Sequence, residues 1–154
     1  KILNIATNQS NKNLKSLINF VNKNKKYFLI QIGSKKKEIK NNILYLKNIQ
    51  QVELNSFLRY SDVYISTSNF EGFGRPPVEA RLCNLPVLCL NNKINNEILG
   101  DSSFYFENFK KMEKKIIIAI KNKKKNNFIK KYVLNKNTIT KTQKLIRSIL
   151  WKNY

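Results

Sequence analysis

Apolar residues form short, separated clusters along this chain, and the spacing within each cluster distinguishes helices from strands. Leu14, Leu17, Ile18 and Val21 recur at positions i, i+3, i+4 and i+7, the spacing of one apolar helix face. Short continuous apolar runs are instead typical of buried strands. Six such runs predict strands, at residues 2–7, 27–32, 43–46, 62–67, 86–90 and 104–106.

The order of these elements predicts the fold class. Strands alternate with helices, including a short helix near residues 54–58, as in βαβ units with a parallel sheet. Helical spacing along residues 109–120 and 145–150, separated by a charged stretch at 121–127, predicts a tail without strands. We therefore predict one α/β domain: a Rossmann-like three-layer fold with a parallel sheet of five or six strands and a helical C-terminal tail. Ligands bind such sheets beyond the carboxyl ends of the strands, near the topological switch point.

The charge of the chain is strongly positive. Its 30 lysine and arginine residues against nine acidic ones give a net charge of +21. A basic surface suits phosphate groups, either of nucleic acid or of anionic lipid. The joint abundance of Lys, Asn and Ile, with only four Arg, favours the coding bias of an AT-rich genome as the origin of this charge. The hydrophobic fraction of 42% is that of a globular chain, and no apolar run approaches the ~18 residues of a membrane-spanning helix.

Cysteine and histidine usage limits the chemistry that the chain can perform. It has two cysteines, Cys83 and Cys89, and no histidine. We therefore expect no disulfide framework, no metal site and no cofactor, and a reducing, cytoplasmic compartment. Both cysteines have apolar neighbours, so we expect both to be buried. The chain starts at Lys1 without an initiator Met, and we interpret it as a piece of a longer protein.

The most informative stretch of the sequence is NFEGFGRPPVEARLCNLP, residues 69–86. Gly72 and Gly74 allow the backbone to turn tightly and to approach a ligand. A loop rich in N–H groups that leads into a helix N-terminus is an anion site. The stretch therefore predicts a phosphate-binding loop at the end of a strand.

Prolines and an asparagine delimit the helix that follows this loop. Pro76 and Pro77 suit a first helical turn, where missing N–H groups cost little. We expect the helix over residues 77–83. Asn84 follows, where a left-handed residue ends a helix, and Asn tolerates that conformation second to Gly.

Two carboxylates, Glu71 and Glu79, flank the predicted anion site. Carboxylates repel phosphate, so we expect them to accept hydrogen bonds from neutral hydroxyl groups. A phosphate and hydroxyl groups recognised by one loop and helix describe a nucleotide sugar. The alternative is a capped helix with two surface carboxylates.

The segment EGFGRPPVEA resembles the E-x7-E signature of glycosyltransferase family 4. The similarity continues on both sides, through LRYSDVYISTSNFEGFG and RLCNLPVLCLNNKINNEI, and ATNQSNKNLKSLINF resembles the first βα unit of that family. It covers roughly residues 1–150. The resemblance implies the C-terminal, donor-binding half of a GT-B glycosyltransferase, residues 1–154, with the N-terminal acceptor domain absent from this chain.

The resemblance also implies roles for individual residues. Glu79 would hold the ribose hydroxyl groups, and Glu71, the candidate catalytic residue, would face the transferred sugar. Backbone N–H groups at Gly72, Phe73 and Gly74 would meet the sugar or the diphosphate.

Two basic residues have expected roles near the diphosphate. Lys12 matches the lysine that contacts the diphosphate in the family. The Arg that usually precedes it is absent from residues 6–9, so Lys15 is a possible substitute one helical turn away. Arg75 replaces a common Leu or Met, and either adds a donor near the phosphates or points to solvent.

The implied activity is retaining transfer of a hexose from a nucleoside diphosphate sugar to an acceptor hydroxyl, in cell-surface polysaccharide or glycolipid synthesis. The isolated domain would be inactive, because the N-terminal domain supplies the acceptor site. No D-x-D motif occurs, so no metal is implied. Expected partners are the donor, the N-terminal domain and an anionic membrane surface on the cytoplasmic side. Two alternatives are a basic nucleic-acid-binding domain and a non-catalytic relative that binds nucleotide sugars.

Overall fold

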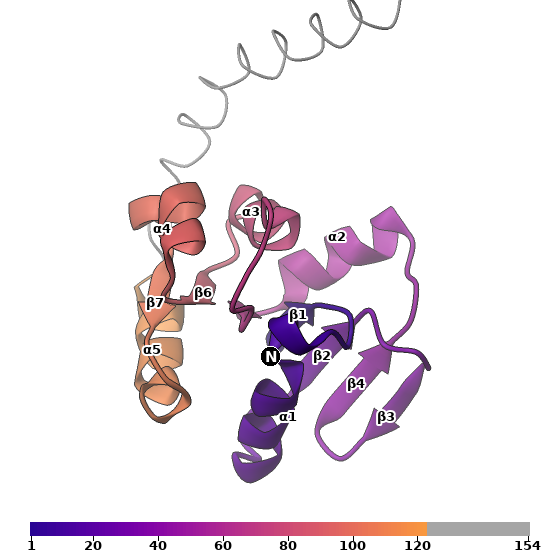
Figure 1. Ribbon diagram of the computed structural model, residues 1–154. Helices are drawn as coiled ribbons and strands as arrows, with labels where there is room; N and C mark the ends of the chain where they lie inside the picture. The colour runs from indigo at the N-terminus through magenta and orange to yellow at the C-terminus, as the bar shows by residue number, and fades with distance from the viewer. Residues whose placement is uncertain (123–154) are drawn as a thin grey trace, which may run out of the picture.

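A computed structural model describes residues 1–122 and contains one seven-stranded sheet (Figure 1). The spatial order of the strands is β3-β4-β2-β1-β5-β6-β7. Their bounds are β1 Ile2–Ile5, β2 Leu29–Ile32, β3 Glu38–Lys40, β4 Ile43–Leu46, β5 Val63–Ser66, β6 Val87–Leu90 and β7 Phe104–Phe106. All neighbouring strands pair in parallel except β3 and β4, which are antiparallel.

Helices connect the parallel strands and cover both faces of the sheet. They are α1 Leu14–Lys23, α2 Gln51–Tyr60, α3 Arg75–Leu82, α4 Lys93–Leu99 and α5 Phe109–Lys121, with two short 3-10 helices, η1 Ser10–Lys12 and η2 Gly100–Ser102. In Figure 1, α2, α3 and α4 lie above the sheet, and α1 and α5 lie below it. The domain therefore has the three layers that the alternating pattern predicts.

Two apolar clusters hold the layers together. On the upper face, Leu58 of α2, Val78 of α3 and Leu99 of α4 pack on the sheet. On the lower face, Leu17 of α1 and Ile116 of α5 do the same. The predicted apolar face of α1 is thus confirmed, because Leu14, Leu17 and Val21 are buried at helical spacing and Ile18 is partly buried beside them.

The predicted fold class is confirmed, and the sheet is larger than the predicted five or six strands. All six predicted strands are present, with ends trimmed by one or two residues in most of them. The additional strand is β3, whose three residues are all exposed. An exposed edge strand among lysines has no apolar pattern, so its sequence resembles a loop. The helix α4 was also not predicted, and the predicted apolar face at 145–150 lies outside the described residues.

The helix after the glycine loop begins at Arg75, two residues earlier than predicted, and ends at Leu82. Pro76 and Pro77 are its second and third residues, consistent with their expected place in the first turn. Asn84 has a φ of 60°, which confirms the left-handed conformation predicted after the helix.

The two cysteines differ in their surroundings. Cys89 on β6 is fully buried, and burial raises the pKa of its thiol. Cys83, after α3, is only half-buried, so the expectation of two buried cysteines is wrong for this residue. Its position at the end of a short surface helix explains the exposure.

Candidate functional site

The chain reverses direction across the sheet between β1 and β5. The first half builds β1, β2, β4 and β3 outward on one side, and the second half builds β5, β6 and β7 on the other. The loops that follow β1 and β5 therefore diverge at the topological switch point, where parallel α/β sheets bind ligands. Lys12 lies after β1 and Glu71 after β5, as the sequence predicts.

Hydrogen bonds fasten these two loops to each other. The Thr67 hydroxyl donates to the Lys12 carbonyl at 2.8 Å, and the Asn69 N–H donates to the Asn11 carbonyl at 2.8 Å. The Asn11 amide also donates to the Phe70 carbonyl at 3.3 Å. The backbone on both sides of the switch point is thus held in one arrangement.

Lys12 and Glu71 form an ion pair across this junction. The Lys12 Nζ lies 2.7 Å from the Glu71 Oε2. The side chains are only 19% and 16% exposed, so the pair is shielded from solvent more than a surface ion pair is. The structure therefore joins two predicted site residues that are 59 positions apart in the sequence.

The glycine loop presents backbone at the same edge. Gly74 has a φ of 65°, in the left-handed region, and caps the start of α3. A Cβ placed on Gly72 would have no atom within 4 Å, so open space lies beside its backbone. Pro76 and Pro77 carry no N–H, which concentrates the backbone donors at this helix start in residues 72–75.

The remaining predicted residues lie around this loop. Glu79 is in the second turn of α3 and is partly exposed, whereas Arg75 is exposed at the first position of the helix. Phe73 is 52% exposed. Burial raises the pKa of the Tyr64 hydroxyl well above its usual range, and the negative charges of Glu71 and Glu79 add to that shift. The helix α3, which carries Glu79, packs against β5, on which Tyr64 is buried.

Several supporting residues were not predicted from the sequence. The Asn92 amide donates to the Ser68 carbonyl at 3.2 Å, while its Oδ1 accepts the Asn95 N–H and caps α4. The buried Gln31 amide donates to the Ala6 carbonyl at 2.7 Å. The signal that could have indicated Gln31 is a polar residue inside a predicted strand, because burying an amide is costly unless it is hydrogen-bonded.

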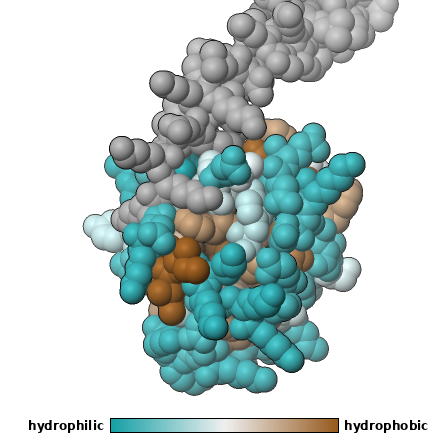
Figure 2. Space-filling view, turned by 90° about the vertical axis from the view of Figure 1, so that its left-hand side faces the viewer, coloured by the Kyte–Doolittle hydropathy of each residue, from teal (hydrophilic) through white to brown (hydrophobic). Residues whose placement is uncertain are grey.

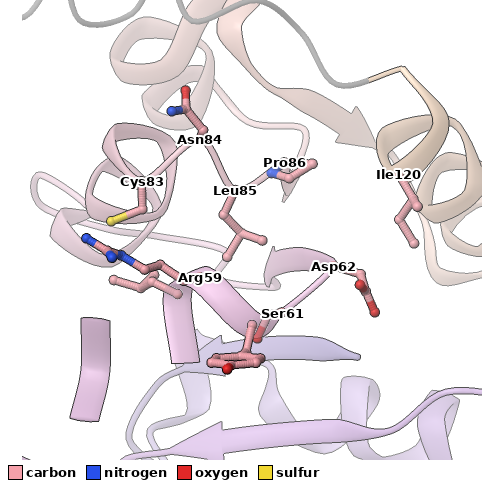
Figure 3. Close-up of a pocket in the computed structure, with 10 residues that line it drawn as sticks. Arg59, Ser61, Asp62, Cys83, Asn84, Leu85, Pro86 and Ile120 are labelled. Atoms are coloured by element: carbon pink, nitrogen blue, oxygen red, sulfur yellow. The ribbon is translucent and has the colours of Figure 1, made fainter. Parts of the chain in front are cut away.

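A cavity of about 410 Å³ lies at the opposite edge of the sheet (Figure 3). Its lining includes Ser61 and Asp62, just before β5, and Leu85 and Pro86, just before β6. None of the predicted site residues lines it. The cavity and the predicted site are therefore separate, at the amino and carboxyl edges of the same sheet.

Residues 1–122 contain neither a candidate metal site nor a membrane-spanning helix. No group of three or more His, Cys, Asp or Glu side chains there could hold a metal ion. No helix in this part of the chain is long and apolar enough to cross a membrane.

Several solved structures share the fold of this chain, and one of them is a sugar transferase. The pneumococcal O-GlcNAc transferase GtfA, in complex with UDP and GlcNAc, matches with a TM-score of 0.68 at 14% identity, over 97% of this chain and 35% of that one. TarM matches with a TM-score of 0.63 at 22% identity, over 80% of this chain and 28% of that one. A mutant of S. aureus TarM in complex with Fondaparinux, alpha-GlcNAc-glycerol and UDP matches with a TM-score of 0.64 at 21% identity, over 80% of this chain and 29% of that one. The chain thus spans about a third of the length of these proteins.

The fold is an α/β domain of the kind that GT-B glycosyltransferases contain. The chain belongs to the family of glycosyl transferases group 1, whose family model matches residues 1–136. No curated protein sequence matches the chain significantly.

Proposed function

We propose that this domain binds a nucleoside diphosphate sugar at the junction of the β1 and β5 loops. In the whole protein it would serve retaining transfer of a hexose to an acceptor hydroxyl, as in glycosyltransferase family 4. The observation that carries this proposal is the convergence at one switch point of a lysine, a glycine loop, a helix N-terminus and two glutamates.

The diphosphate would be held by Lys12 and by backbone N–H groups of residues 72–75. A lysine is a mobile point charge that suits a leaving phosphate, and the N-terminus of α3 adds a favourable dipole. The family usually has an Arg a few residues before this lysine. Because this chain has none there, Lys12 is the one basic residue in the loop of residues 6–13. Arg75 is exposed beside the loop, and it would add a second cation on the donor side.

The hydroxyl groups of the donor would be recognised by the two glutamates. Glu79, on the second turn of α3, would accept hydrogen bonds from the ribose, and Glu71, earlier in the loop, from the transferred sugar. Charge-assisted hydrogen bonds of this kind contribute roughly 1.5–3 kcal/mol each. The two glutamates would thereby distinguish a nucleotide sugar from a bare diphosphate.

We assign the acceptor site to an N-terminal domain outside this chain, because the chain spans about a third of the solved glycosyltransferases. Catalysis would require both domains to close on the donor. The product would be a cell-surface polysaccharide or a glycolipid, made on the cytoplasmic side.

The isolated 154-residue chain is expected to bind a nucleoside diphosphate weakly and to transfer no sugar. Binding needs only the edge site, whereas transfer needs the acceptor domain. Calorimetric titration with UDP, GDP and ADP measures the first, and release of UDP from UDP-sugars in the presence of acceptors measures the second. Sugar transfer by this chain alone would show that the acceptor site is wrongly assigned to a separate N-terminal domain.

A basic face suits contact with an anionic membrane surface. The exposed side of α5 carries Lys110, Lys111 and Lys114 together with two exposed isoleucines, Ile117 and Ile118. On the side of the molecule that carries α5, Figure 2 shows a hydrophobic spot enclosed by hydrophilic side chains. We propose that this face rests on anionic lipid, which attracts each nearby lysine by about 1 kcal/mol.

Vesicle sedimentation tests this proposal. The chain is expected to bind vesicles containing phosphatidylserine, to dissociate as salt is raised, and to bind less after replacement of the three lysines by Gln. Equal binding to neutral vesicles would exclude the electrostatic explanation. Parallel titration with nucleic acid tests the competing basic-domain interpretation, which requires a steep salt dependence of nucleic-acid affinity.

A further inference from the structure

The Lys12–Glu71 ion pair unites two groups to which the proposed function gives different ligands. Lys12 is assigned to the diphosphate and Glu71 to the transferred sugar. In the structure the two charges neutralise each other at 2.7 Å, and both side chains are more than four-fifths buried. Neither group can bind its own ligand at full strength while the pair persists.

We propose that Glu71 acts as an internal substitute for the donor phosphate, and that donor binding exchanges the partner of Lys12. The inference rests on the proposed function. In the ligand-free domain the Glu71 carboxylate accepts a hydrogen bond from the Lys12 Nζ. When a diphosphate arrives, its oxygens take over the ammonium group, and the released carboxylate accepts a hydrogen bond from a sugar hydroxyl.

Electrostatics requires the exchange. A carboxylate and a diphosphate repel each other, so both cannot share one ammonium group without loss. The loop of residues 6–13 holds no second basic residue that could neutralise the extra charge. Arg75, the proposed second cation, is exposed at the start of α3, so Lys12 is the shielded cation for which Glu71 and the phosphate compete, and the multiply charged phosphate prevails.

The local architecture permits the exchange as a side-chain movement. The carbonyl of Lys12 is fixed by the Thr67 hydroxyl, and Asn11 is bonded to the β5 loop through its backbone and its amide. The lysine side chain has a flexible four-carbon stem, and its terminal ammonium group carries three N–H donors. The ammonium group can therefore turn to another acceptor while the backbone stays in place.

The exchange couples two recognition events. Glu71 becomes available to the sugar only after the diphosphate has engaged Lys12. A free monosaccharide cannot displace the lysine, because a neutral hydroxyl does not compete with a carboxylate for a cation. The pair thus makes Glu71 a positioning residue for Lys12 in the empty site and a sugar ligand in the occupied one.

The test is a double-mutant cycle on the 154-residue chain, titrated with UDP, GDP and ADP. Glu71→Gln removes the competing charge and keeps the shape, so it is expected to tighten nucleoside diphosphate binding by about tenfold, the factor that ~1.4 kcal/mol represents. Lys12→Met is expected to weaken binding. Glu71→Gln in the Lys12→Met background is expected to give a clearly smaller gain, because only the direct repulsion between carboxylate and phosphate is then removed and no Lys12 ammonium group is released.

A matched control separates local exchange from net charge. Glu107→Gln removes one exposed negative charge after β7, away from the switch point, and is expected to leave affinity unchanged. Equal or weaker binding by Glu71→Gln, or a gain that is as large without Lys12 as with it, would overturn the exchange. Wild-type chain that binds none of the three nucleotides would overturn the proposed function as well. A wild type that binds, with no gain in Glu71→Gln, would overturn the exchange alone.

Discussion

Substitution of Gly33 by Ala is expected to lower the free energy of unfolding by about 2–5 kcal/mol. Gly33 follows β2 with a φ of +101°, where an L side chain is strained by ~1–2 kcal/mol. Its added Cβ would lie 2.6 Å from the Ala6 carbonyl oxygen and 3.0 Å from the Ala6 carbonyl carbon. These are backbone atoms that cannot rotate away, so overpacking adds roughly 1–3 kcal/mol.

Urea denaturation followed by circular dichroism measures this loss. Gly72→Ala is the matched control, because a Cβ there meets no atom within 4 Å. Its stability is expected to stay within ~0.5 kcal/mol of wild type. Equal stability of the two variants would show that Gly33 does not pack against Ala6 as described.

The same contact links stability to the site. Ala6 begins the loop that carries Lys12, and its carbonyl accepts a hydrogen bond from the Gln31 side chain. A shift of Ala6 away from a new methyl group would move the start of this loop. Gly33→Ala that remains folded is therefore expected to bind nucleoside diphosphate more weakly than wild type.

Glu79→Gln is expected to weaken nucleoside diphosphate binding by roughly 1–3 kcal/mol, or about 5- to 150-fold. The substitution keeps the shape of the side chain and removes the charge that would accept the ribose hydroxyl groups. Because the ribose is present in UDP and in UDP-sugars alike, Glu79→Gln is expected to weaken binding of both ligands by a similar factor.

Calorimetry with UDP and a UDP-sugar on Glu79→Gln, and on Glu107→Gln as the control, separates a local contact from a change in net charge. The control variant is expected to bind like wild type. If Glu79→Gln also binds both ligands like wild type, the assignment of the ribose to Glu79 is wrong. The E-x7-E segment would then be a capped helix with two acidic side chains.

Local patterns predicted most of this fold. The apolar spacing of α1 and the short apolar runs of the parallel strands are complete within a few residues of sequence, and each was found in place. The turn at Asn84 was predictable for the same reason, because the tolerance of Asn for positive φ is a property of the residue itself.

Features that depend on distant residues were not predictable. β3 is a strand because β4 offers it an edge, although its own residues are exposed and mostly charged. Gly33 is constrained by Ala6, which lies on another strand connection far away in the sequence. The pairing of Lys12 with Glu71 needs two loops at one switch point, and the family resemblance implies separate ligands for these two residues.

The burial of Arg81 was also not predictable, although the helix that contains it was predicted. It lies on the buried face of α3 with 1% of its surface exposed, and burial lowers the pKa of its guanidinium group. It donates a hydrogen bond to the Leu85 carbonyl at 3.3 Å. A charged residue is rarely fully buried, so composition alone places it at the surface.

Crystals of the chain, soaked with the nucleoside diphosphate that binds most tightly, would show where the donor binds. We expect the diphosphate beside Lys12 and the backbone of residues 72–75, with the ribose hydroxyl groups within hydrogen-bond distance of Glu79. We also expect Lys12 to have turned from Glu71 to the phosphate. A nucleotide bound instead at the opposite edge of the sheet, in the cavity lined by Ser61, Asp62 and Pro86, would contradict the proposed site.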